Sequence, residues 1–238
     1  MRNIWLLAMS IWMSFAQVGI SDQPAASSIK KYEARNFDHL LGKIKGLNDE
    51  LLRLHFKLYQ GYVNNANTLF QKIEEFSQAG KSQSPEVAGF KHMLGWEFNG
   101  MILHEYYFEN LGGKNHQLKQ DNPLFLKIVQ DFGSYASWKA DFQATGAIRG
   151  IGWVITYIDP KQGRLVNTWI NEHDVGHLSG GQPLLVMDVF EHAYITQFGL
   201  DRAKYIQIFF DNIDWEVVFQ RYQKSLQAIR LTLCGQTN

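Results

Sequence analysis

Pro183-Leu-Leu-Val-Met-Asp188-Val-Phe-Glu-His192 joins a short apolar run to a carboxylate and then to a histidine four residues later. The apolar run predicts a buried strand that ends near Asp188. If a helix begins at Asp188, its side chain and that of His192 share one helical face. A carboxylate beside an imidazole suits iron or manganese, which alternate between divalent and trivalent states. The same pattern also fits a helix-capping carboxylate next to a buried histidine.

The residues before this segment predict the rest of a small antiparallel sheet. Residues 153–158 and 164–170 are rich in β-branched and aromatic side chains, and Asp159-Pro-Lys-Gln-Gly163 between them is a turn sequence. With residues 183–187 they give three short strands. Helices are expected to surround the sheet at residues 123–132, 134–145, 202–210 and 215–229, and from Val189 onward.

Toward the N-terminus the apolar residues follow a helical period. They recur at three- and four-residue spacing from Asp38 to Glu75, and Ser84-Pro85 starts a second helical stretch that ends before Gly112-Gly113. We expect these two helices to be antiparallel neighbours. The fold class is therefore α+β, with an N-terminal helical hairpin domain (residues 38–113) and a C-terminal α/β domain (residues 122–230) that holds a three-stranded antiparallel sheet and helices.

Composition limits the partners of the chain. Its 238 residues include 23 Lys and Arg and 23 Asp and Glu, so no overall field favours nucleic acid or an anionic membrane. The apolar content of 45% permits a substantial core. With a single cysteine, the chain cannot form an intramolecular disulfide.

The first residues predict export. Arg2 precedes an apolar run over residues 4–15, and small side chains at Ser14 and Ala16 complete the layout of a signal peptide over residues 1–16. An uncleaved anchor or an apolar helix of the fold is the alternative, although the run is shorter than the roughly 20 residues of a membrane-spanning helix. We expect an exported protein, periplasmic or secreted, without stable membrane association after cleavage, and a flexible lead-in over residues 17–37.

Three further segments, which lie before the Asp188 segment, carry a resemblance to a known family through their order in the sequence. They are Leu54-His55 with Tyr62-Val63-Asn64-Asn65, then Asn99-Gly100-Met-Ile-Leu-His104, and then Phe132-Gly-Ser-Tyr with Gly150-Ile-Gly152-Trp153. In this order they resemble the iron/manganese superoxide dismutase family, from about Asp38 to Tyr222. The block from Asp188 to Tyr205, with Asn212 to Trp215, is the most specific part of the resemblance.

The resemblance implies an activity and a set of ligands. The activity would be conversion of two superoxide anions to hydrogen peroxide and oxygen at one iron or manganese ion per subunit, and the sequence does not decide between the metals. The implied metal ligands are His55, His104, Asp188 and His192. A catalytically impaired, exported metal-binding protein of the same fold is the alternative, and a peroxide-using metalloenzyme is a more distant one.

The resemblance also reveals a missing glutamine. The family's glutamine hydrogen-bonds metal-bound solvent from one of two places, which here read Gly100 and Arg149. A guanidinium cannot accept a proton, although it could attract an anion or stay outside the site. His173 and His177 lie just before the ligand block, so one of them, His173 by slight preference, is expected to supply the missing hydrogen bond. Alternatively, both are loop histidines that face solvent.

Tyr62 falls at the position of the family's tyrosine beside the substrate channel, seven residues after His55 instead of the usual eight. Seven residues are two helical turns, so Tyr62 can still share a face with His55. The alternative is an ordinary core aromatic.

Two further departures concern the wall of the site and the subunit contact. Phe190 stands where a tryptophan normally walls the site, which keeps an aromatic ring and loses an indole donor. In the family, a histidine and a tyrosine form a bridge between subunits. Here the position of the histidine reads Leu58 or Tyr59, and the position of the tyrosine reads Ile195, so both partners of the bridge are lost. Glu191 remains, and in the family this glutamate reaches a ligand histidine of the other subunit. The resemblance therefore implies a homodimer.

Overall fold

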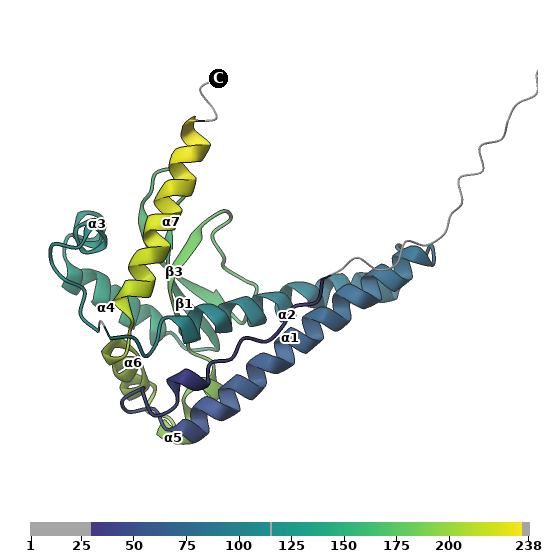
Figure 1. Cartoon of the computed structure of the whole chain (residues 1–238), viewed down its shortest axis with the longest axis horizontal. Coiled ribbons are helices and arrows are strands. Elements are labelled where there is room, and N and C mark those ends of the chain that lie inside the picture. The colour runs from purple at the N-terminus through teal and green to yellow at the C-terminus, as the bar shows by residue number, and fades with distance from the viewer. Residues whose placement is uncertain (1–29, 115, 235–238) are drawn as a thin grey trace, which may run out of the picture.

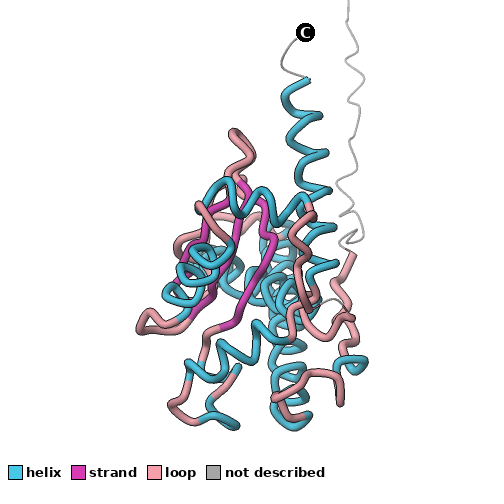
Figure 2. Tube along the Cα trace, turned by 90° about the vertical axis from the view of Figure 1, so that its left-hand side faces the viewer, coloured by secondary structure: helices cyan, strands magenta, loops and turns pink. Residues whose placement is uncertain are grey.

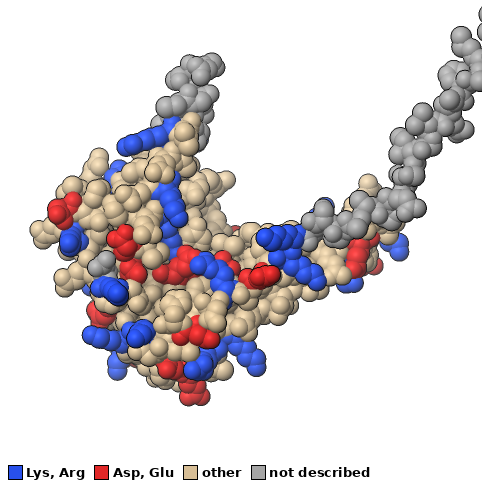
Figure 3. Space-filling model, in the orientation of Figure 1, with Lys and Arg blue, Asp and Glu red and all other residues tan. Residues whose placement is uncertain are grey.

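The computed structural model describes residues 30–114 and 116–234 as a helical hairpin followed by a three-stranded sheet with further helices. This arrangement confirms the predicted α+β fold class (Figure 1). The signal peptide expected over residues 1–16, and the lead-in as far as residue 29, lie outside the described residues. Basic and acidic side chains are interspersed over the face in Figure 3.

The hairpin consists of α1 (Asp49–Gln78) and α2 (Pro85–Glu109), which run side by side and project away from the sheet (Figure 1). Asn48 caps α1 through its side chain, which accepts a hydrogen bond from the backbone N–H of Leu51. Ser84 caps α2 in the same way, and proline at the first helical position needs no partner for its nitrogen.

The expected start of the first helix at Asp38 is wrong. Residues Asp38–Leu40 form a single 3-10 turn, and the α-helix begins only at Asp49. The reason lies in Gly42 and Gly46, whose φ angles of 70° and 88° are left-handed and interrupt a right-handed helix. The apolar spacing here reflects packing of a folded loop, since Leu40 and Leu47 are both buried.

The end of the predicted lead-in is held against the hairpin. The backbone N–H of Tyr32 donates to the Asn67 side chain, whose amide donates back to the Tyr32 carbonyl, both at 2.8 Å. Arg35 pairs with Glu109, and Phe37 is 4% exposed in the core. Residues 32–37 are therefore anchored on α1 and α2, and the prediction of a flexible segment is wrong for them.

The sheet has the order β2-β1-β3, with both pairings antiparallel, and its strands lie side by side in Figure 2. The central strand β1 (Gly152–Ile158) is buried at every position, whereas β2 (Leu165–Asn171) is an edge strand with partly exposed side chains. The third strand, β3 (Gln182–Asp188), ends at the carboxylate that was singled out in the sequence. The three predicted strands are confirmed within a residue of their limits.

The helix that was expected from Val189 onward does not begin there, and no helix starts at Asp188. The strand continues to Asp188, Phe190 is extended with ψ 153°, and a 3-10 turn follows over Glu191–Ala193. A short α5 (Ile195–Phe198) comes next. Because the Asp188 carboxylate accepts a hydrogen bond from the Phe190 N–H at 2.8 Å, the aspartate closes a tight turn instead of starting a helix.

The remaining helices surround the sheet. α4 (Tyr135–Gly146) packs on β1 and β2 beside α3 (Pro123–Phe132), and α7 (Trp215–Cys234) packs on β3. α6 (Arg202–Asp211) places its buried side chains against the end of β3. Among the described residues, no helix has the length and apolar character needed to cross a bilayer.

Candidate metal centre

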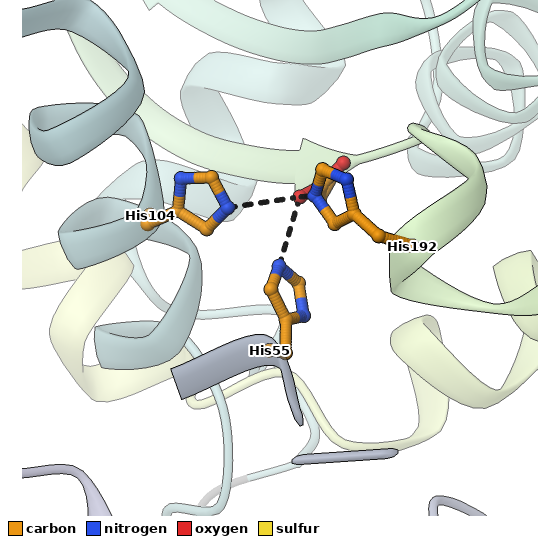
Figure 4. A group of neighbouring side chains, drawn as sticks. His55, His104 and His192 are labelled. Atoms are coloured by element: carbon orange, nitrogen blue, oxygen red, sulfur yellow. Dashed lines mark hydrogen bonds and ion pairs between the residues drawn. The ribbon is translucent and has the colours of Figure 1, made fainter. Parts of the chain in front are cut away.

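Four side chains from distant parts of the sequence converge between the hairpin and the sheet (Figure 4). His55 comes from α1, His104 from α2, Asp188 from the end of β3 and His192 from the 3-10 turn. One potential ligand atom from each lies within 4.8 Å of the others. The side chains of the first three residues have no solvent exposure, and that of His192 is 26% exposed. The structure thus brings together all four residues that the resemblance implied as ligands.

The Asp188 carboxylate lies at the middle of the cluster. Its Oδ2 is 3.1 Å from His55 Nε2, 3.0 Å from His192 Nε2 and 3.6 Å from His104 Nε2. The three imidazoles therefore present the same nitrogen to one carboxylate oxygen. Three nitrogens and one oxygen converging on a point form a donor set that suits iron or manganese.

His104 gives the clearest sign that the cluster fits a cation. Its Nδ1 lies 2.6 Å from the carbonyl oxygen of Gly100, which can only accept, so Nδ1 carries the ring proton. Its Nε2 then offers a lone pair to the cluster, and this buried atom has no hydrogen-bond partner among the described residues. A buried polar atom without a partner is costly, and a metal ion would satisfy it.

The surroundings of the cluster shift the pKa values of His55, His104 and Asp188. Burial lowers the pKa of both His55 and His104, which keeps their rings neutral. Burial acts to raise the pKa of Asp188, but its interactions with His192 and His55, which include hydrogen bonds to both rings, outweigh burial and lower that pKa. Neutral rings at His55 and His104 and an ionised carboxylate at Asp188 are the forms that bind metal without first losing a proton.

Neighbouring groups fix the orientation of Asp188. Its Oδ1 accepts from the Phe190 N–H, and its main-chain carbonyl accepts from the Tyr205 hydroxyl at 2.6 Å. Burial raises the pKa of Tyr205, so this hydroxyl keeps its proton and remains a donor. Oδ2 is thereby directed at the three histidines.

Asn110, which the sequence analysis missed, ties the two halves of the site together. Asn110 follows α2 and is fully buried. Its side-chain oxygen accepts from the Val186 N–H at 3.1 Å, and its side-chain nitrogen donates to the Val186 carbonyl at 3.0 Å, on the outer edge of β3. Arg221 of α7 also donates to its side-chain oxygen at 3.0 Å. The helix that carries His104 is thus joined to the strand that ends in Asp188.

Tyr62 lies beside the cluster, with its ring centroid 5.1 Å from that of His104. A Cβ atom on Gly100 would come within 2.6 Å of the Tyr62 ring, so only glycine leaves room for it. One of the two places where the family keeps its glutamine is therefore filled here by an aromatic ring. The absence of a side chain at Gly100 is what allows the Tyr62 ring to lie here.

His173 is fully buried beside Tyr62, and its Nε2 lies 2.8 Å from the tyrosine hydroxyl. The Trp153 indole donates to its Nδ1 at 3.0 Å. Phe190 is stacked between His173 and His192, with centroid distances of 4.6 and 5.0 Å. The Trp96 ring contacts the His173 ring edge-on, with centroids 4.9 Å apart. The sequence signal for this contact is the position of Trp96 eight residues before His104 on the same helix.

The other residues predicted for the site lie away from the cluster. His177 is hydrogen-bonded to the Tyr157 hydroxyl at 2.7 Å and to the carbonyl of His173 at 2.9 Å. Arg149 is exposed on the turn before β1, and Glu191 is exposed beside His192. Of the two spare histidines, the structure brings only His173 next to Tyr62 and the ligands.

A cluster of three histidines and one aspartate that could hold one metal ion, set between a helical hairpin and a three-stranded sheet, is the class of site that this structure defines. Comparison with known proteins agrees with it. Residues 120–221 match the family model for the C-terminal domain of iron/manganese superoxide dismutases. The chain is 33% identical over 199 residues to an iron superoxide dismutase of Cupriavidus metallidurans, a match that covers 82% of this chain and 98% of that protein.

Relatives named for both metals are similar to the chain. The iron superoxide dismutase of Aquifex aeolicus is 34% identical over 199 residues, covering 80% of this chain and 92% of that protein. Superoxide dismutase [Mn] 2 of Haloferax volcanii is 31% identical over 182 residues, covering 76% and 89%. The chain belongs to the iron/manganese superoxide dismutase family of oxidoreductases, with one iron or manganese ion per subunit.

Proposed function

We propose that this protein is an active superoxide dismutase, which converts two superoxide anions and two protons to hydrogen peroxide and oxygen. The observation that carries the proposal is the convergence of three imidazole nitrogens and one carboxylate oxygen within 4.8 Å. Within the described part of the chain, the buried Nε2 of His104 has no hydrogen-bond partner. The bound metal supplies the chemistry of accepting an electron from one superoxide and returning it to the next. His55, His104, Asp188 and His192 would hold it.

The surrounding residues would donate protons and exclude water. Burial raises the pKa of Tyr62, so its hydroxyl keeps its proton and can donate it to reduced oxygen. Phe190 and Trp153 enclose the site with apolar surface, and Phe190 is only 7% exposed. The partly exposed His192 marks the side from which a small anion could enter.

The proposal is tested by loading the protein separately with iron, manganese and zinc and measuring superoxide decay per bound metal by pulse radiolysis. Either the iron or the manganese form should accelerate decay catalytically. The zinc form is a matched control and should be inactive, because zinc does not change oxidation state. If neither the iron form nor the manganese form accelerates superoxide decay beyond the zinc form, the protein is instead the catalytically impaired member of the family.

Gly100→Ala is expected to keep the metal and lose turnover. The new methyl group would collide with the Tyr62 ring and displace its hydroxyl, and a shift of about 1 Å can cost roughly 100-fold in rate. Gly95→Ala on the same helix is the control, since nothing lies within 4 Å of its Cβ position. Equal turnover in the two variants, measured per bound metal, would show that the close approach of Tyr62 to Gly100 is irrelevant to activity.

We also propose export, on the strength of residues 1–16 alone. The mature protein isolated from its own host should begin near Gln17, as determined by N-terminal sequencing. Recovery of soluble cytoplasmic protein that retains Met1 would refute this prediction.

A homodimer is proposed as well, because Glu191 is exposed next to the ligand His192 and could reach a second copy. Sedimentation equilibrium of the metal-loaded protein should give the mass of two subunits. A measured mass of one subunit would contradict the proposed homodimer.

A further inference from the structure

One peptide group joins the Asp188 carboxylate to a cation outside the cluster. It is the group between Val189 and Phe190, whose N–H donates to Asp188 Oδ1 at 2.8 Å. Its carbonyl oxygen accepts from Nη2 of Arg202 at 3.0 Å. The same peptide group therefore donates to the carboxylate on one side and accepts from a permanently charged guanidinium on the other.

The guanidinium of Arg202 is held in place by several parts of the fold. Its Nη1 donates to the carbonyls of Ile148 and Gly150, at 3.1 and 3.0 Å, in the turn before β1. The group also lies over the rings of Trp169 and Tyr194, 5.7 and 5.8 Å from their centroids. Because a lysine ammonium lacks the planar fork that these contacts use, the position of the charge is specific to arginine.

Val189 is also bonded through its own N–H. This group donates at 2.9 Å to the carbonyl of Gly152, the first residue of β1. The N–H and the carbonyl of Val189 are thus held by β1 and by Arg202. The turn that follows Asp188 cannot shift without breaking one of these two hydrogen bonds.

We infer that Arg202 is a positioning residue, which acts through the peptide between Val189 and Phe190 to hold and polarise the hydrogen bond to Asp188 Oδ1. A cation at the carbonyl strengthens the N–H as a donor, because hydrogen bonds in a chain polarise one another. A stronger donor withdraws electron density from the carboxylate, whose other oxygen faces the three histidines. Arg202 thereby sets the orientation of Asp188 and the electron density that it offers to a metal ion.

Nuclear magnetic resonance of the zinc-loaded protein tests the inference without any turnover. The Phe190 amide proton should lie downfield in the wild type, because its hydrogen bond to a carboxylate is charge-assisted, and Arg202→Met should shift it upfield. Arg202→Lys keeps the charge without the fork and should shift it less, so the test remains decisive even if Arg202→Met does not fold. A Phe190 amide proton that stays in place in every folded variant would overturn the inference.

Arg221→Met is the matched control. Arg221 is also a partly buried arginine that donates to main-chain carbonyls, those of Leu184 and Tyr106, and it lies over the Tyr106 ring at 4.5 Å. Its replacement should lower the free energy of unfolding but leave the Phe190 amide proton in place. Equal upfield shifts in this control and in Arg202→Met would mean that lost stability moves the proton, and would overturn the inference.

The bound metal gives a second readout. In the iron-loaded protein, Arg202→Met should make the midpoint potential more negative, because removal of a positive charge near the cluster favours the trivalent ion. Metal affinity, measured by competition with a chelator, should fall by roughly 10-fold. A midpoint potential equal to that of the wild type would overturn the inference.

The inference rests on the proposed function only for the metal held by the cluster. If the iron and manganese forms of the wild type did not dismutate superoxide, the proposed function would fail. The Phe190 amide proton and the midpoint potential would still decide whether Arg202 acts on Asp188.

Discussion

The Asp188→Asn protein is expected to fold normally and to contain almost no iron or manganese. Asparagine keeps the size of the side chain, and its oxygen can still accept from the Phe190 N–H. It lacks the negative charge that Oδ2 presents to His55 and His192. Since loss of an outer hydrogen-bond partner of a metal ligand costs about 10- to 100-fold in affinity, loss of the only anionic ligand should cost more than 100-fold.

Metal per subunit, measured by inductively coupled plasma mass spectrometry on protein with an unchanged circular dichroism spectrum, checks this expectation. Asp174→Asn is the control, because its carboxylate is exposed and only the charge is removed. Near-normal metal content in Asp188→Asn would mean that the metal is held elsewhere.

Asn110→Ala is expected to lower the free energy of unfolding by about 3–5 kcal/mol, because it leaves the buried N–H and carbonyl of Val186 without partners. Arg221 would also lose an acceptor. Metal content should fall as well, because the Asn110–Val186 hydrogen bonds join the helix that carries His104 to the strand that ends in Asp188.

Urea unfolding of equally metal-loaded proteins gives the comparison. Asn64→Ala, at an exposed position of α1, is the matched control and should change the free energy of unfolding by less than about 0.5 kcal/mol. An Asn110→Ala protein as stable as this control would show that the amide does not tie the halves of the molecule together.

The ligands could be predicted from the sequence more readily than the local structure that holds them. The pattern of Asp188 and His192 suggested a shared helical face, yet the two side chains meet across a strand end and a 3-10 turn. Spacing of four residues permits contact in both geometries. The choice between them depends on pairing of β3 with β1 and on the Phe190 N–H, which are tertiary features.

Contacts between distant residues were beyond reach of the sequence pattern. Asn110 and Val186 are 76 residues apart, and Tyr62 and His173 are 111 apart. A lone asparagine after a helix reads as an ordinary cap, and a histidine in a polar stretch reads as a loop residue. The strands and most helices were predictable because their periodicity depends on local burial alone.

The most direct measurement is the anomalous scattering of crystals of the native protein, recorded on both sides of the iron and manganese absorption edges. We expect one peak per subunit, between the Nε2 atoms of His55, His104 and His192 and Oδ2 of Asp188, and the absorption edge identifies the element. A peak from either metal at any other position, or a metal-loaded crystal with no peak between these four side chains, would contradict this expectation.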